Sequence, residues 1–345
     1  MQNKNYKKEI PYEFSDYALE KFFKETGKRQ GWLPENGATA FIAVSGGGDS
    51  IALLWLFYKF YSGRVIALHI NHGLRANESD EDQNFVDSFT SSLKLFLATK
   101  RVKVPVDKLP GESIEAAARR LRLQGLCELV RIFDVNNGGN RAVFLGHNRD
   151  DLAETVLFNI LRGSGIRGSV GITESSEFNG VKFYRPLLEK RRKFLRDMLL
   201  ARGVPWREDS SNLDSKYTRN FIRLELLPLI ERKINSSAVE HLANFGEDMR
   251  PVRLSEEQLS IDFFRECLDD FSSPEIIFSR RKLKAKTNEE ISLIIRYAGR
   301  KLNLPTLSRD RCQELIRLIR SSRSFIFQWA GGVEVKSKDG KIFLG

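Results

Sequence analysis

The chain has 345 residues, of which 41% are hydrophobic and 29% charged, and it carries a formal net charge of +11. This length suits two domains, and the composition is that of a globular protein rather than a disordered one. The longest apolar run, residues 51–60, is too short to span a bilayer, so we expect no membrane partner.

Apolar periodicity predicts alternating helices and strands along the first half of the chain. Helices are expected at residues 12–30, 51–61, 82–97, 113–133 and 151–161, and strands at 40–44, 65–70, 101–106 and 142–145. This alternation predicts the α/β class, with a doubly wound parallel sheet covered by helices on both faces. Ligands of such sheets bind beyond the carboxyl ends of the strands.

The pattern changes after residue 220. A helix is expected at 221–235 with a kink at Pro228, followed by a polar helix at 236–249 and a boundary near Pro251. Two further helices and three short strands are expected in the last section, at 291–302, 309–320, 324–329, 333–336 and 342–344. We therefore predict a catalytic domain at 1–225, a helical linker at 226–250 and a small α+β domain at 251–345.

The cysteine pattern and the distribution of charge indicate the cellular compartment and the class of binding partner. The three cysteines lie far apart without a Cys-x-x-Cys pair, which argues against zinc and disulfide frameworks. No apolar segment follows the N-terminal residues, so a cytoplasmic protein is expected. Residues 185–207 carry eight Lys or Arg against two acidic residues, which favours nucleic acid as a partner. Residues 250–345 carry 19 Lys or Arg against 13 Asp or Glu. A solvated surface explains this excess as well as a nucleic-acid partner does.

The six residues Ser45-Gly46-Gly47-Gly48-Asp49-Ser50 separate an expected strand from an expected helix. The three glycines allow positive φ and a close approach of the backbone to a ligand. Amide groups at such a turn and at a helix N-terminus attract an anion, and the two serines add hydroxyl groups. We predict a phosphate-binding loop here; a helix cap beside a flexible turn is the alternative.

Asp49 brings a negative charge into this loop, where it would repel a bare phosphate. The charge is explained if Mg²⁺ lies between the carboxylate and the phosphates. The loop is not a Walker A motif, because no Gly-Lys-Ser/Thr ending follows. Asp49 is therefore predicted to be a metal ligand.

A second group of polar residues, His147, Asp151 and Glu154, follows the strand expected at 142–145. Asp151 and Glu154 are three residues apart and share a helical face. Carboxylates at a helix N-terminus are favoured by the dipole alone, but the dipole does not explain the imidazole. These side chains can orient a nucleophile, hold a second metal or bind an ammonium group. The odd spacing of His69 and His72 points them to opposite faces for as long as their strand lasts, so they are not paired as ligands.

The loop at 45–50 resembles the SGGxDS signature of the PP-loop ATP pyrophosphatases. Further segments resemble the tRNA(Ile)-lysidine synthetase family within that group: Asn71-His72-Gly73-Leu74-Arg75, Glu115-Ala116-Ala117-Ala118-Arg119-Arg120, His147 to Thr155, Leu161-Arg162-Gly163-Ser164-Gly165, Tyr184-Arg185-Pro186-Leu187-Leu188, Asp209-Ser210-Ser211-Asn212 and Tyr217 to Arg223. The resemblance covers most of residues 39–225. Asn148 departs from it, because many members carry a second His there.

The resemblance implies a ligase that uses ATP and Mg²⁺. It implies that the wobble cytidine of the isoleucine tRNA with a CAU anticodon is adenylated at C2, and that the ε-amine of free L-lysine displaces AMP to give lysidine. The implied partners are that tRNA and lysine, and a homodimer is the family-based expectation.

Site residues are carried over by position. The resemblance implies that Ser45, Gly46, Gly47, Gly48, Asp49 and Ser50 bind ATP, that Asp49, His147, Asp151 and Arg219 are catalytic, and that Glu154 binds the lysine ammonium. The basic segment adds Arg185, Arg191, Arg192 and Lys193 as expected tRNA contacts.

Three rival functions remain at this stage. A tRNA-thiolating PP-loop enzyme would need paired cysteines or an iron–sulfur cluster, which the scattered cysteines disfavour. A small-molecule amide ligase such as an NAD or GMP synthetase would not need the basic segments. A non-enzymatic RNA-binding protein would not need Asp49, His147 and Asp151.

Overall fold

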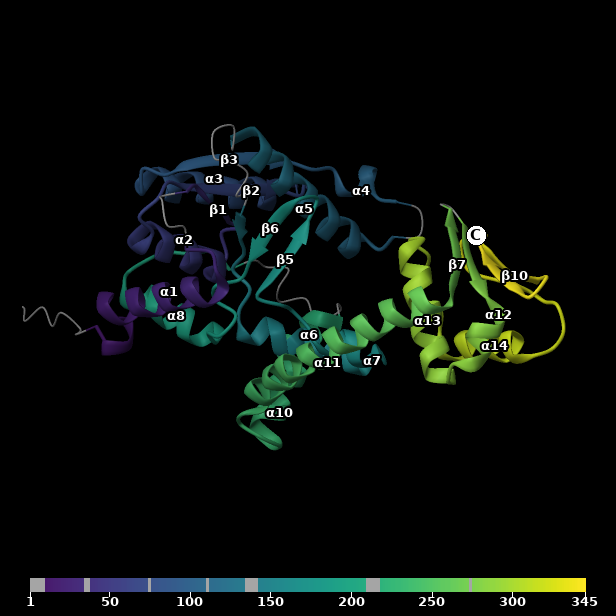
Figure 1. Ribbon diagram of the computed structural model, residues 1–345. Helices are drawn as coiled ribbons and strands as arrows, with labels where there is room; N and C mark the ends of the chain where they lie inside the picture. Colours follow the sequence, from purple (N-terminus) through teal and green to yellow (C-terminus); the bar gives the residue numbers. More distant parts are fainter. Residues whose placement is uncertain are drawn as a thin grey trace, which may run out of the picture. The chain divides into compact units, whose positions relative to one another are not determined.

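The computed structural model describes residues 10–33, 38–73, 76–109, 112–133, 142–208, 218–272 and 275–345. Leu74, Arg75, the Asp209–Asn212 segment and Tyr217, which carry parts of the resemblance, lie outside these ranges. The chain divides into two compact units, Met1–Glu247 and Asp248–Gly345 (Figure 1).

The first unit is built on a six-stranded sheet with the order β3-β2-β1-β4-β6-β5. The strands are β1 (Ala40–Ala43), β2 (Val65–Asn71), β3 (Phe96–Arg101), β4 (Ala142–Phe144), β5 (Ser175–Phe178) and β6 (Val181–Tyr184). All neighbours pair in parallel except β5 with β6. β1 is flanked by β2 on one side and β4 on the other, so the strand order reverses beside β1, where such sheets bind ligands.

Helices cover both faces of this sheet, as the alternating sequence pattern predicts (Figure 1). One face packs α1 (Asp16–Gln30), α2 (Gly48–Phe60), α3 (Ala76–Ser92) and α8 (Arg192–Ala201) against side chains such as Ile42 and Phe144. The other face packs α5 (Ile114–Phe133) against Phe41, Ile66 and Val143. Successive strand residues thus enter opposite cores. Two short helices, η1 (Tyr12–Phe14) and α4 (Val104–Asp107), complete these layers.

The rest of the first unit is helical. It comprises α6 (Arg149–Leu161), α7 (Gly165–Ser169), α9 (Thr218–Phe221), a π-helix (Ile222–Leu226), α10 (Leu227–Lys233) and the start of α11 (Ala238–Cys267). The π-helix ends at Leu226, two residues before Pro228 in the first turn of α10. Proline has no N–H and crowds the preceding turn, so the wider turn accommodates it.

The second unit contains a five-stranded antiparallel sheet with the order β7-β8-β11-β10-β9. Its elements are β7 (Leu268–Ser272), β8 (Glu275–Ser279), α12 (Arg280–Ala285), α13 (Asn288–Lys301), α14 (Arg309–Arg320), β9 (Ile326–Gln328), β10 (Glu334–Lys338) and β11 (Lys341–Leu344). Ile291, Ile294 and Leu315 of its helices pack with Phe327 and Ile342 of the sheet.

The predicted fold class is confirmed, and three local expectations are corrected. The strand expected at 101–106 lies at 96–101, and the helix before it spans 76–92. β3 is an edge strand whose second half, Thr99 to Arg101, is polar, so its sequence lacks a long apolar run. α11 also continues through Pro251, because it is buried on both sides of that residue, at Ala243 and at Phe264. Among the described residues, no helix is long and apolar enough to cross a membrane.

Candidate active site

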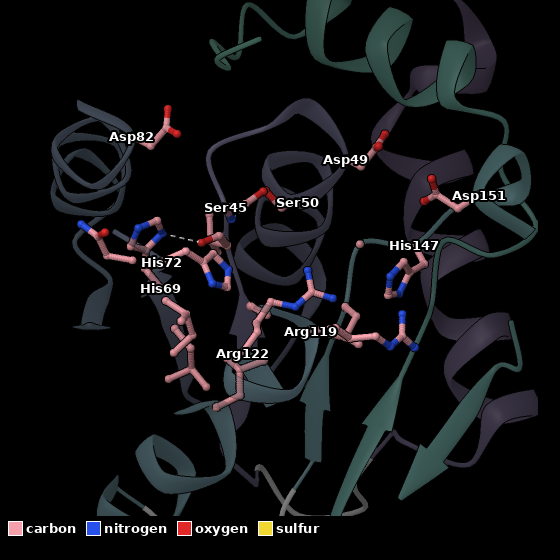
Figure 2. Close-up of a pocket in the computed structure, with 18 of the residues that line it drawn as sticks. Ser45, Asp49, Ser50, His69, His72, Asp82, Arg119, Arg122, His147 and Asp151 are labelled. Carbon is pink, nitrogen blue, oxygen red and sulfur yellow. Dashed lines mark hydrogen bonds between the residues drawn. The ribbon is translucent and has the colours of Figure 1, made fainter. Parts of the chain in front are cut away.

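A cavity of about 460 Å³ lies at the carboxyl ends of β1, β2 and β4. It is lined by residues that follow each strand, including Ser45 after β1, His72 after β2 and His147 after β4. Figure 2 shows Asp49 and Asp151 near one another on one side of it. Sequence segments 100 residues apart therefore meet at one place, because parallel strands end at the same edge of a sheet.

The glycine-rich loop is held in shape by its own side chains. Gly46 has φ +95°, a backbone conformation that favours glycine. The Ser50 hydroxyl donates to the Gly47 carbonyl at 2.9 Å and accepts from the Ser45 amide at 3.1 Å. Because the single proton of Ser50 is used inside the loop, this side chain closes the turn at the start of α2.

The segment after α8 supports the loop from outside. The Arg207 amide donates to the Gly46 carbonyl at 3.0 Å, and Gly47 forms a parallel bridge with Arg207. A β-carbon at Gly48 would lie 3.3 Å from the Trp206 ring. The phosphate-binding loop predicted from the sequence is thus a braced structure, and its amide groups are presented at the N-terminus of a 13-residue helix.

The N-terminus of α6 brings Asp151 to the cavity. Asn148 caps this helix, since its side chain accepts from the Asp151 amide at 3.0 Å and its own amide donates to Asp151 Oδ2 at 3.0 Å. This reciprocal capping box fixes the Asp151 side chain. Asn148, which departs from the family pattern, has a structural role here.

Asp151 and Glu154 form a cluster with two arginines. Arg192 Nη2 lies 2.9 Å from both Asp151 Oδ1 and Glu154 Oε1. Arg223, from the π-helix, makes the same two contacts at 2.9 Å through Nη2 and Nε. The Glu154 side chain is only 1% exposed, and Glu154 does not line the cavity. Arg219 does line the cavity and donates to Thr155 Oγ1 at 3.0 Å.

This cluster sets the charges of the carboxylates. Burial opposes the charge of Asp151, but Arg192, His147 and Arg223 outweigh it and lower the pKa of Asp151. Burial and the nearby Asp151 raise the pKa of Asp49, and Arg192, at 3.7 Å, compensates only in part. Asp49 Oδ1 is buried without a hydrogen-bond partner. Asp49 is thus a carboxylate that would gain from a cation.

Three histidines line the cavity, and all are held neutral. Burial lowers the pKa of His147 to about 3 and that of His72 to about 4, and burial also lowers the pKa of His69. Nδ1 of His147 and of His72 and Nε2 of His69 have no partner. His69 and His72 both line the cavity, because β2 ends at Asn71 and the alternation of faces does not extend to His72.

Sequence reasoning missed Arg119 and Arg122 of α5, which also line the cavity. Figure 2 shows both between the His69–His72 side of the cavity and His147. Burial lowers the pKa of Arg122 to about 10, and its Nε has no partner. Their three-residue spacing, which places both on one face of the expected helix, was the available signal.

The four expected tRNA contacts lie in different environments. Arg185 is buried and donates to the Thr173 carbonyl and Ser176 Oγ, both at 2.9 Å. Arg191 contacts Asp150 and Glu231 at 3.1 Å, and Arg192 belongs to the acidic cluster. Lys193 alone of the four is largely exposed, at 84%, and forms a pair with Asp197 within α8.

The fold and the loop define a class of nucleotide-binding protein. Residues 12–230 match the PP-loop domain family. The match covers more than half of the chain, so the chain belongs to the PP-loop family.

Within that family, the chain belongs with the tRNA(Ile)-lysidine synthases. It is 33% identical to the enzyme of Rhodopirellula baltica over 292 residues, covering 76% of this chain and 70% of the relative. It is 34% identical to the enzyme of Thermus thermophilus over 309 residues, which cover 88% of this chain and 56% of that relative. The relative from Solibacter usitatus is 37% identical over 215 residues, covering 62% and 46%.

The chain spans about half the length of several relatives. It covers 46% of the relative from Solibacter usitatus, 54% of that from Parabacteroides distasonis and 48% of that from Symbiobacterium thermophilum. Among solved structures, the U34-tRNA thiolase NcsA from Methanococcus maripaludis superposes with a TM-score of 0.53. Sequence identity is 15%, and 67% of this chain and 79% of that chain are covered. At this identity the likeness concerns the fold alone.

Proposed function

We propose that this protein joins lysine to C2 of the wobble cytidine of an isoleucine tRNA with a CAU anticodon, with ATP as co-substrate. The observation that carries the proposal is the meeting of the PP-loop, His147 and Asp151 in one cavity. The names of the relatives support this reaction over others that the same fold hosts.

The cavity suits ATP. The loop at 45–50 leads into the N-terminus of α2, where an anion is stabilised. Arg119, Arg122 and Arg219 bring positive charge to the same space. ATP, when bound, supplies the adenylyl group that turns the cytidine C2 oxygen into a leaving group.

Mg²⁺ fits beside Asp49. The described residues contain no cluster of three His, Cys, Asp or Glu side chains that would hold a metal alone. The ion would therefore be shared between the partnerless Oδ1 of Asp49 and phosphate oxygens. It would neutralise the charge that burial and Asp151 make costly at Asp49.

His147 is suited to the lysine amine. An amine is mostly protonated at neutral pH and attacks only after losing a proton. The neutral His147 ring, with a partnerless Nδ1, accepts a hydrogen bond from the amine, and the Asp151 carboxylate offsets its charge. Glu154 would act through Arg192 and Arg223 unless these side chains move aside for lysine.

We further propose that the tRNA contacts basic residues of both units, with Lys193 as one contact in the first unit and Lys or Arg side chains of residues 250–345 in the second. Because the proposed substrate is a tRNA, we also propose that the protein acts in the cytoplasm.

The test is AMP release from ATP, measured with and without the tRNA and with and without lysine. Release that requires both, together with labelled lysine entering the tRNA, is the expected result. Release that needs tRNA but ignores lysine would replace the proposal with another tRNA modification. Release without tRNA would point to a small-molecule ligase.

Asp49→Ala tests the assigned site. We expect AMP release to fall by about a hundredfold or more, because the carboxylate nearest the phosphate loop is lost. Glu177→Ala is the control, since this carboxylate is exposed on the edge strand β5. An unchanged rate in a folded Asp49→Ala protein would remove Asp49 from the mechanism.

A further inference from the structure

The first turn of α6 is fastened to several other elements through consecutive residues. Arg149 contacts α11, Asp150 contacts α8, and Asp151 contacts Arg192 and Arg223. Only Asp151 of these three lines the cavity. The other two have no contact with the proposed chemistry, although they are its neighbours in the chain.

Arg149 makes the most extensive of these attachments. Its Nε lies 2.9 Å from Glu240 Oε2, its Nη1 lies 2.7 Å from Glu247 Oε1, and its Nη2 donates to Asn244 Oδ1. These acceptors are four and three residues apart and share one face of α11. The Arg149 side chain is only 8% exposed. One guanidinium therefore holds two turns of α11 against the first turn of α6. Figure 1 shows these two helices beside one another.

A second arginine extends this attachment. Arg191 contacts Asp150 Oδ1 and Glu231 Oε1, each at 3.1 Å, and Glu240 Oε1 at 3.8 Å. Glu240 is thus shared between Arg149 and Arg191. The charges alternate in sign from α11 through α6 to α10, so each carboxylate faces at least one guanidinium.

We propose that Arg149 is a positioning residue that sets the direction of the Asp151 carboxylate by fixing the first turn of α6 to α11. Asp151 Oδ1 receives two arginine contacts at 2.9 Å while Oδ2 caps the helix. A small rotation of this turn would misalign all of them. The role of Asp151 in the reaction rests on the proposed function; the attachment itself does not.

Apolar side chains also hold α6 against α11, so the fold does not depend on Arg149 alone. Leu152, Val156 and Ala243 form an apolar contact between α6 and α11. A β-carbon at Gly246 would lie 2.8 Å from Val156 Cγ2, so the helices approach closely there. This apolar contact remains when Arg149 is changed, and we expect Arg149→Gln to fold.

Hydrogen–deuterium exchange tests the attachment without reference to activity. In Arg149→Gln we expect amide exchange in residues 148–153 to rise on the order of tenfold, with residues 48–56 of α2 unchanged. Arg202→Gln is the matched control, because Arg202 is similarly buried and pairs with Asp16 away from α6. Unchanged protection of α6 in folded Arg149→Gln would overturn the proposal.

Turnover tests the consequence. We expect kcat for tRNA- and lysine-dependent AMP release to fall about tenfold in Arg149→Gln with KM for ATP unchanged, and Arg149→Lys to recover part of it. Faster exchange with unchanged kcat would overturn the positioning role. If the wild-type protein lacks this activity, the proposed function fails while the exchange result still tests the attachment. Should Arg149→Gln not fold, Glu247→Gln removes one partner, and we expect the same changes at smaller amplitude.

Discussion

Gly146 lies directly against the backbone of Asp49. A β-carbon at Gly146 would be 2.9 Å from the Asp49 carbonyl oxygen and 3.0 Å from the Ser50 amide nitrogen. The second residue after β4 therefore contacts the first turn of α2, which brings His147 beside the phosphate loop. Only a residue without a side chain allows this approach.

Gly146→Ala is expected to lower the free energy of unfolding by about 1–3 kcal/mol, because the new methyl group forces two backbone segments apart. It should also weaken ATP binding, measured by calorimetry. Gly47→Ala is the control for stability. At Gly47 φ is −72° and the nearest atom to a β-carbon would be 3.7 Å away. Equal stability of the two variants would contradict the packing argument.

Glu154→Gln is expected to lower the free energy of unfolding by about 3 kcal/mol, because it removes a buried carboxylate that both Arg192 and Arg223 contact. Urea unfolding measures this loss, with the exposed Glu177→Gln as control. A stable Glu154→Gln protein that has lost lysine binding would instead support the role implied by the family resemblance, in which Glu154 binds the substrate ammonium.

Stability is expected to decrease as the pH falls from 7 to 5. Burial lowers the pKa of His147 to about 3, whereas the unfolded chain titrates near 6.5. Below pH 6.5 the unfolded state takes up a proton that the folded state does not bind, so folding loses about 1–2 kcal/mol from this residue at pH 5. His147→Gln should reduce the difference between the unfolding free energies at pH 7 and pH 5. An unaltered difference would show that His147 is not held neutral.

Lys193→Gln is expected to weaken tRNA binding a few-fold and to lower the slope of log affinity against log salt by about 1, without loss of stability. Arg191→Gln should instead destabilise the fold, because Asp150 and Glu231 lose their partner. Salt-dependent filter binding and thermal melting separate the two effects. Lys21→Gln, on the exposed face of α1, is the control. A fall in tRNA affinity for Lys21→Gln equal to that for Lys193→Gln would make the contact non-specific.

Local patterns in the sequence predicted the glycine-rich loop and the parallel sheet, which are the features of the site formed by the backbone. The glycines at 46–48, between an apolar strand and an apolar helix, indicated the phosphate loop, and the alternation of helices and strands indicated the sheet that presents it. Such signals lie within about ten residues, where backbone conformation and burial are determined by neighbouring side chains. The edge strand β3 was displaced in the prediction because its second half, Thr99 to Arg101, is polar.

Only the tertiary structure decided which charged side chains meet. Arg192 and Lys193 are adjacent and alike in sequence, yet the first is buried against Glu154, 38 positions away, while the second is 84% exposed. Arg223 reaches Asp151 across 72 positions. A cation has the same local sequence signature whether it faces solvent or a buried carboxylate. The role of a charged side chain therefore depends on which distant elements the fold places beside it. Local sequence patterns do not distinguish these cases, because the contacts join residues far apart in the chain.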